Sequence, residues 1–286
     1  MPKLKISFFQ YCPIFNEVNK NLINVINLLS ENSAEINKSD VVIFPEYFLS
    51  GSLDLNHFEE YKNQLKNLDL IERLKLLSKE YKNTTFIFGS CILPSSVNGK
   101  FGNISLAVCN GEVLASYDKK ALIYNENYTC IATDNYPIFD VKGIKIGLTI
   151  CWDTILPEVY RHYVKKADLV ITPAFWGIGG NALQAKYPQS LEKTYYRQLL
   201  VTRAYENAFA TLFVNSVGQY KSPFYSDRMM GGSLAVMPPI GEVFFTNSKK
   251  ASELQSLELD FSYLSQYREF YATDQDFLYY KSKNIF

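Results

Sequence analysis

Several features that mark particular classes of protein are scarce or missing in this sequence. Its 286 residues carry 29 basic and 29 acidic side chains, so the formal net charge is +0. A neutral chain has no overall field that would gather phosphates. No apolar run approaches the roughly 20 residues that span a bilayer, and the first residues form no apolar signal segment. We therefore expect a soluble protein with neither nucleic acid nor membrane as a partner.

Cysteine is infrequent and irregularly placed. The five cysteines are Cys12, Cys91, Cys109, Cys130 and Cys151. No two of them stand at C-x-x-C spacing and their number is odd, which argues against both a zinc knuckle and a disulfide framework. Unpaired cysteines are typical of a reducing compartment, so the sequence predicts a cytoplasmic location.

Histidine is scarcer still, and this limits the choice of catalytic base. The only two are His57 and His162, and neither directly follows an apolar strand. A cysteine nucleophile usually pairs with a histidine base. If a thiol acts here, a base other than histidine is the simpler expectation.

The composition and the order of patterns indicate a folded α/β chain. Hydrophobic residues make up 47% and charged residues 20%, which excludes a disordered or fibrous protein. Apolar runs and alternation predict strands at 3–11, 41–44, 85–92, 104–109, 113–117, 137–141, 144–150, 168–172, 209–214, 233–237 and 243–245. Helical spacing predicts helices at 18–29, with Asn16 as N-cap, at 70–81, from Pro157, and from Ser190 to about Asn207. The alternation of strands and helices predicts a layered α/β fold with one mixed sheet or two.

Turn residues and the C-terminal composition refine this organisation. Asn110-Gly111 and Lys142-Gly143 are expected to close hairpins, and Gly241-Glu242 to form a turn. We expect one main domain over 1–262. The remaining residues, 263–286, are aromatic and charged. A tail this apolar is expected to pack on the body or on a second subunit.

Three polar residues at the ends of apolar strands are candidates for chemistry. Glu46 follows 41–45, where desolvation would raise the pKa of its carboxyl and make it a better base. A lysine at 119 or 120 follows 113–118 and could stabilise an oxyanion. Cys151 ends 144–150, a position where a thiol can have a depressed pKa and act as a nucleophile. Taken singly, a loop glutamate, a solvated lysine pair and a buried thiol are the more frequent interpretations.

Taken together, the motifs resemble those of the nitrilase superfamily, the carbon–nitrogen hydrolases, from about Leu4 to Phe245. The resemblance rests on five segments in the family's order: Phe44-Pro45-Glu46 with Gly51, Tyr117-Asp118-Lys119 with Leu122, Gly147 to Asp153 with Pro157-Glu158, Arg203 to Asn207, and Gly232-Ser233 with Pro239-Ile240-Gly241. In that register the lysine is Lys119 and not Lys120.

The resemblance implies a four-layer αββα sandwich with two mixed sheets, often dimerised, and a Glu–Lys–Cys mechanism without metal or organic cofactor. Glu46 would be the general base, Lys119 with the backbone N–H of Trp152 would hold the oxyanion, and Cys151 would be the nucleophile. A second glutamate of the family corresponds to Glu126, which would orient Lys119 and the substrate. Arg203, Glu206 and Asn207 are interpreted as structural.

Three positions depart from the family's common residues. Ala121 stands where histidine is common, Thr133 where glycine is common, and Trp152 where tyrosine is commoner. The first two affect the local shape of the loop that carries Glu126, and through it the substrate, more than the catalytic set.

The substrate is the least determined feature. Phe175 or Trp176, after the strand at 168–172, is expected to form an aromatic wall near the thiol. Lys221 and Arg228 lie in a stretch that could form a rim, although simple surface solvation is the favoured interpretation of both cations. We expect hydrolysis of a small amide, with an N-carbamoyl amine and then a nitrile as alternatives, in a homodimer or larger homo-oligomer. A scaffold or binding protein with an idle site is the non-enzymatic alternative.

Overall fold

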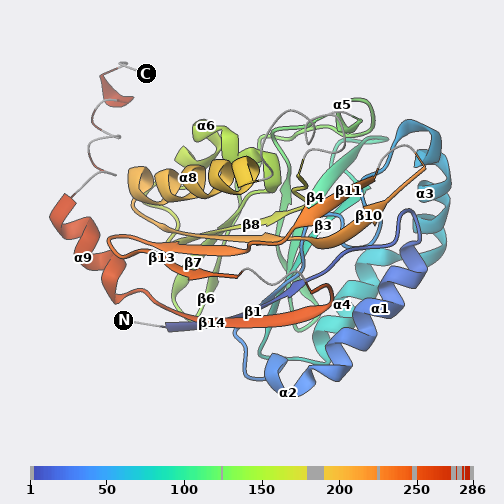
Figure 1. Ribbon diagram of the computed structural model, residues 1–286, viewed down its shortest axis with the longest axis horizontal. Helices are drawn as coiled ribbons and strands as arrows, with labels where there is room; N and C mark the ends of the chain where they lie inside the picture. Colours follow the sequence, from blue (N-terminus) through green and yellow to red (C-terminus); the bar gives the residue numbers. More distant parts are fainter. Residues whose placement is uncertain are drawn as a thin grey trace.

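The computed structural model describes residues 3–123, 125–178, 190–223, 226–246 and 250–271, together with 275, 279 and 281–283. These residues form two six-stranded sheets and a separate two-stranded hairpin. The sheets lie between two layers of helices, with α1, α3 and α4 on one side and α6 and α8 on the other (Figure 1). The architecture is the four-layer αββα sandwich that the sequence analysis expected.

Each sheet combines parallel and antiparallel neighbours. The first has the order β14-β1-β2-β3-β4-β5 and the second β13-β12-β9-β8-β7-β6. In the first sheet β1, β2 and β3 are parallel, and in the second β7, β8 and β9 are parallel. The strands of the first sheet are β1 Lys3–Gln10, β2 Val41–Ile43, β3 Thr85–Pro94, β4 Phe101–Cys109, β5 Glu112–Asp118 and β14 Glu253–Asp260. Those of the second are β6 Ile138–Val141, β7 Ile144–Leu148, β8 Leu169–Ala174, β9 Ala210–Asn215, β12 Leu234–Met237 and β13 Gly241–Phe245.

The remaining elements cover the sheets or connect them. The hairpin consists of β10 Val217–Lys221 and β11 Ser226–Met230. The helices are α1 Val18–Glu31, α2 Ser33–Ile36, α3 Leu55–Leu68, α4 Leu70–Lys79, α5 Glu126–Thr129, the 3-10 helix η1 Cys151–Ile155, α6 Pro157–Arg161, α8 Ser190–Asn207 and α9 Ser262–Tyr271.

Alternation along the strands assigns side chains to the layers. In β2, Val41 and Ile43 join the core between the sheets, whereas Val42 joins the core beneath the helices. In β1, Phe8 faces the other sheet and Phe9 faces the helices. Because successive side chains point to opposite faces and both faces are covered, β2 is apolar throughout and β1 has an apolar residue on each face at Phe8 and Phe9.

Two predicted hairpin turns are confirmed, and two finer expectations are wrong. Asn110-Gly111 and Lys142-Gly143 all have positive φ, as two-residue hairpin turns require. Asn16 does not cap α1, because it has a φ of 50° and the N-cap position is Glu17. Gly241-Glu242 lies within β13 rather than in the turn before it.

Several elements were absent from the sequence expectations, among them α3, β14 and the β10–β11 hairpin. Helix α3 has few buried side chains, so its apolar stripe is weak. Strand β14 mixes exposed and half-buried positions, because it lies at the edge of the first sheet against β1. Alternation is hard to detect where neither face is fully buried.

The first part of the C-terminal tail contacts the body of the protein. In α9, Leu264 and Tyr267 are buried, and the Tyr267 hydroxyl donates to the carbonyl of Tyr205. Arg268 forms an ion pair with Asp168 at 2.7 Å. These contacts attach α9 to the end of α8 and the start of β8. Most of the residues beyond 271 lie outside the described part of the chain.

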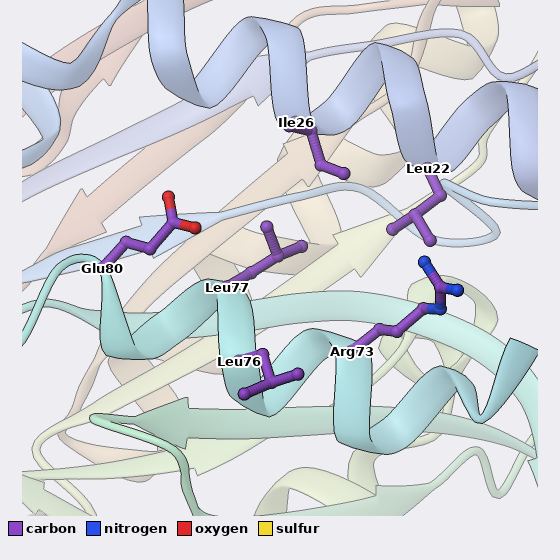
Figure 2. A pocket seen from close by; sticks show the side chains of 6 residues that line it. All are labelled: Leu22, Ile26, Arg73, Leu76, Leu77 and Glu80. Carbon is purple, nitrogen blue, oxygen red and sulfur yellow. The ribbon is translucent and has the colours of Figure 1, made fainter.

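A depression on the helical surface lies between α1 and α4 and is lined by Leu22, Ile26, Arg73, Leu76, Leu77 and Glu80 (Figure 2). It lies on the helix-covered side of the first sheet, away from the core between the sheets. Among the described residues no helix combines the length and apolarity needed to cross a membrane.

Candidate active site

The two sheets contribute different parts of one buried cluster. Glu46 follows β2 and Lys119 follows β5, so both come from the first sheet. Cys151 follows β7 and Phe175 follows β8, so both come from the second. The side chains of Glu46, Lys119 and Cys151 are almost inaccessible to solvent, with residue exposures of 1%, 1% and 3%. The structure therefore brings together the three residues that the sequence motifs singled out.

Glu46 is held by a tight turn against β3. A Cβ at Gly89 would lie only 2.0 Å from the carbonyl oxygen of Pro45, so only glycine permits this close approach. One carboxylate oxygen, Oε2, accepts from the backbone N–H of Phe175 at 2.9 Å. The other, Oε1, accepts from Lys119 Nζ at 2.8 Å. Glu46 thus connects the lysine of the first sheet to the backbone of the second.

Lys119 lies between two carboxylates. Its Nζ is 2.8 Å from Glu46 Oε1 and 3.0 Å from Glu126 Oε2. Burial by itself would lower the pKa of this lysine, but the two neighbouring carboxylates raise the pKa well above its ordinary value. The ammonium therefore stays protonated, and two of its three N–H groups are directed at carboxylates.

Glu126 is positioned almost entirely by hydrogen-bond donors. Its carboxylate accepts from the backbone N–H of Ile123 at 2.9 Å, from Asn103 Nδ2 at 2.6 Å and from the Tyr47 hydroxyl. Lys119 supplies a further donor. These donors fix the position of the buried carboxylate.

Two members of this cluster were missed by the sequence analysis. Asn103, in β4, donates from Nδ2 to both Glu46 and Glu126. Its backbone carbonyl accepts from the backbone N–H of Lys119. Tyr47, which directly follows Glu46, donates from its hydroxyl to Glu126. The available signal was a buried asparagine within an apolar strand, since buried polar side chains require partners.

The Cys151 thiol contradicts one expectation. The residue begins η1 with a φ of 45°, and its thiol is buried beside the charges of Glu46 and Lys119. Burial raises the pKa of this thiol well above its ordinary value, the Glu46 charge raises it further, and Lys119 only partly opposes them. A strand-end thiol was expected to have a depressed pKa, but here the surroundings exclude water and include a carboxylate. The resting sulfur is therefore protonated and needs a base.

Glu46 has the properties of that base. Burial raises the pKa of its carboxyl above the ordinary value of 4.5, as the sequence analysis expected. Lys119 opposes this rise in pKa, and the nearby charge of Glu126 adds to it. A carboxylate with a raised pKa beside a neutral thiol can accept the thiol proton near neutral pH.

The raised pKa of Glu46 sets an expected pH dependence. The base must be ionised, so kcat/KM should fall as the pH drops through the Glu46 pKa, and this acid limb should lie above 4.5. Glu126→Gln removes a charge that raises the Glu46 pKa, so the limb should move to lower pH even though turnover declines. A pH–rate profile of both proteins measures this, and a wild-type limb at or below 4.5 contradicts the assignment.

The aromatic residues after β8 lie beside residues of this cluster. The Phe175 ring lies 5.9 Å from the Tyr47 ring, and the Trp176 ring lies 5.0 Å from that of Trp152. The backbone of Trp176 is fixed by Asn215, which accepts from its N–H and donates to its carbonyl. Trp176 Nε1 donates to Glu192 of α8.

The residues interpreted as structural or peripheral lie apart from this cluster. Arg203 donates to the carbonyls of Thr154 and Ile155 and so supports the end of η1. His57, in α3, contacts Asp54, and His162 stacks on Tyr136. Among the described residues, no group of three potential ligands has the arrangement of a metal site.

Lys120 is oriented differently from its neighbour Lys119. Its Nζ lies over the Tyr117 ring at 4.3 Å and the Tyr136 ring at 5.0 Å. It also donates to the carbonyl of Asp118 at 2.6 Å. The structure thus distinguishes the two lysines in favour of Lys119 as the one within the carboxylate cluster.

The departures at positions 121 and 133 have local partners. The backbone N–H of Ala121 donates to Asp153 Oδ1 at 2.7 Å. The Thr133 hydroxyl donates to Asp118 Oδ2 at 2.8 Å, which gives a partner to the carboxylate that precedes Lys119.

The expected rim corresponds to the β10–β11 hairpin, which contacts the segment after β8 through Gly177 and Met229. Lys221 and Arg228 are exposed there.

An αββα sandwich with a glutamate, a lysine and a cysteine converging between its sheets defines the nitrilase superfamily. The sequence family described as carbon–nitrogen hydrolase matches residues 5–269. The chain belongs to this family, whose members are hydrolases acting on C–N bonds.

Individual relatives are similar at low identity. The chain is 25% identical over 288 residues to a protein of Schizosaccharomyces pombe named a probable nitrilase, with 95% of this chain and 94% of that protein covered. The carbon–nitrogen hydrolase from Helicobacter pylori G27 superposes with a TM-score of 0.81 at 18% identity, covering 98% of each chain. A mutant amidase from Nesterenkonia sp. AN1 superposes with a TM-score of 0.73 at 19% identity, covering 92% of each. That structure is described as showing covalent addition of an acetamide moiety at the active site cysteine.

Proposed function

We propose that this carbon–nitrogen hydrolase cleaves a small amide through a thioester on Cys151. The observation that carries the proposal is the burial of the Cys151 thiol beside Glu46, which itself accepts a hydrogen bond from Lys119. Glu46 takes the proton from Sγ, and the thiolate attacks the amide carbon. The carbonyl oxygen becomes an oxyanion, which the remaining N–H of Lys119 and the backbone N–H of Trp152 stabilise. One such donor is worth about two to three decades in rate.

The second half of the proposed reaction uses the same carboxyl group. Protonated Glu46 donates its proton to the leaving nitrogen, the C–N bond breaks and the acyl group remains on sulfur. Glu46 then takes a proton from water, which attacks the thioester and releases the carboxylic acid with return of the proton to Cys151. General acid–base help of this kind contributes roughly 100- to 10,000-fold. Glu126 holds Lys119 in place throughout.

An amide is proposed over the alternatives because several relatives are named amidases, among them an (R)-stereoselective amidase of Pseudomonas sp. that is 24% identical over 283 residues. A release assay over amides, N-carbamoyl amines and nitriles tests this. Ammonia with a carboxylic acid from amides alone supports the proposal, whereas carbon dioxide and ammonia together with an amine identify an N-carbamoyl substrate. Turnover of nitriles but not amides overturns the proposal.

The scaffold alternative is tested without any substrate. An enzyme of this type should react with iodoacetamide at Cys151, and small amides should slow that reaction by occupying the site. A Cys151 that is inert near neutral pH in the folded protein would favour a scaffold. Peptide mass spectrometry distinguishes Cys151 from the other four cysteines.

We further propose a cytoplasmic homodimer. The location is supported by all five cysteines being free thiols. The assembly is supported by the aromatic surface of α9, where Phe270 is 82% and Tyr271 55% exposed. Sedimentation of the protein and of Phe270→Ser tests the assembly, and a monomeric wild type would contradict it.

A further inference from the structure

Asp153 is a fully buried carboxylate whose four hydrogen bonds fall into two groups. Its residue exposure is 0%. Oδ1 accepts from the backbone N–H groups of Lys120 at 2.9 Å and Ala121 at 2.7 Å. Oδ2 accepts from the backbone N–H of Ile150 at 2.9 Å and the Tyr117 hydroxyl at 2.7 Å.

Three of these partners are sequence neighbours of Lys119 and Cys151, which come from different sheets. Lys120 and Ala121 directly follow Lys119, at the end of β5 in the first sheet. Ile150 directly precedes Cys151, after β7 in the second sheet. A single carboxylate therefore fixes the backbone on one side of the lysine and on one side of the cysteine.

The core between the sheets cannot fix this separation by itself. It consists mainly of aliphatic and aromatic side chains, and apolar burial is proportional to area and has no direction. Hydrogen bonds weaken steeply when their distance or angle changes. A carboxylate with four donors is thus better suited than the surrounding core to set the relative position of the two sheet ends.

We propose that Asp153 is a positioning residue that sets the approach of the Lys119 ammonium to the Cys151 sulfur and thereby makes the thiol reactive. This role rests on the function proposed above. Asp153 itself contacts neither substrate nor sulfur in the proposed mechanism. It acts through the backbone of the lysine loop and of the cysteine turn.

The carboxylate is required because all four partners are donors. An ionised aspartate only accepts hydrogen bonds, whereas an asparagine of the same shape accepts at one atom and donates at the other. In Asp153→Asn, the side-chain NH₂ would replace one carboxylate oxygen. It would then face one of the two pairs of donors. The lysine loop or the cysteine turn would then have to move, with little change in side-chain volume.

Asp40 offers a matched control at the opposite end of the sandwich. It precedes β2, whereas Glu46 follows it, and its Oδ2 accepts from the backbone N–H of Lys5 at 2.9 Å. It also pairs with Lys142 of the β6–β7 turn, so it too connects the two sheets. Its residue exposure is 8%. Asp40→Asn therefore makes the same chemical change in a cross-sheet contact far from Cys151.

The experiment measures the second-order rate constant for iodoacetamide alkylation of Cys151 in the full chain, with thermal unfolding in parallel. Asp153→Asn should slow alkylation about 100-fold at pH 7, the loss expected when reacting groups shift by about 1 Å. The inflection of its pH profile should move upward, because the thiolate loses part of its lysine partner. Asp40→Asn should change the rate less than twofold even if both variants lose stability.

Two further variants keep the test decisive. If Asp153→Asn does not fold, Tyr117→Phe removes one of the four donors and should slow alkylation by about three- to tenfold with the pH profile shifted in the same direction. Alkylation of either variant at the wild-type rate, or a loss matched by Asp40→Asn, overturns the positioning role. Cys151→Ala separates this result from the proposed function: if it retains turnover the function fails, whereas loss in Cys151→Ala with normal Asp153→Asn rejects only the positioning role.

Discussion

Cys151→Ala should abolish turnover of any substrate found in the release assay, with a loss of at least about 10⁴-fold. The proposed mechanism has no other nucleophile that can form the acyl intermediate. The fold should persist, because the change removes only a sulfur atom and leaves Glu46 paired with Lys119. Release of product is measured together with the thermal unfolding midpoint.

Cys91→Ala is the matched control for this prediction. Cys91 is also a buried thiol, with a residue exposure of 2%, but it lies in β3 and packs in the core beneath the helices. Its replacement should alter stability by an amount similar to that in Cys151→Ala and leave turnover within about twofold. Persistent turnover in Cys151→Ala would remove the nucleophile assignment.

Lys119→Ala is expected to have the second largest effect. It removes the donor proposed for the oxyanion, which should lower kcat by about 100- to 1,000-fold. It also leaves Glu46 and Glu126 buried without their cation, and breaking a buried pair in this way costs about 3–5 kcal/mol. Turnover per folded molecule and the free energy of unfolding should therefore both fall.

Two comparisons separate these effects. Lys120→Ala removes an ammonium that lies over aromatic rings outside the carboxylate cluster, so kcat should change only a few-fold. Lys119→Met combined with Glu46→Gln removes both charges and should recover part of the stability while remaining inactive. Equal losses of kcat in Lys119→Ala and Lys120→Ala would show that the lysine is wrongly assigned.

The sequence predicted those parts of the structure that depend on strong local patterns. The run at 41–44 is apolar on both faces, and the run at 144–150 is nearly so; β2 is buried, and so is β7 except at Lys145. Glu46, Lys119 and Cys151 were recognisable because each follows a predicted strand and occurs in a family motif. Strand β14 was missed because its side chains are mostly half-exposed at a sheet edge.

The contacts within the site depend on tertiary structure and are less visible in the sequence. Asn103 lies 57 positions from Glu46 in the chain, and no local spacing connects them. The thiol pKa was expected to be depressed because Cys151 ends a strand, yet the full burial of the site and the charge of Glu46 raise it. Only the assembled layers determine which charges surround the sulfur.

The origin of the acid and the sulfur in separate sheets has a consequence for inactivation. A small displacement of one sheet relative to the other would separate Glu46 from Cys151 before any strand unfolds. Mild heating should therefore abolish activity while the circular dichroism spectrum remains that of the native protein, and cooling should restore the activity.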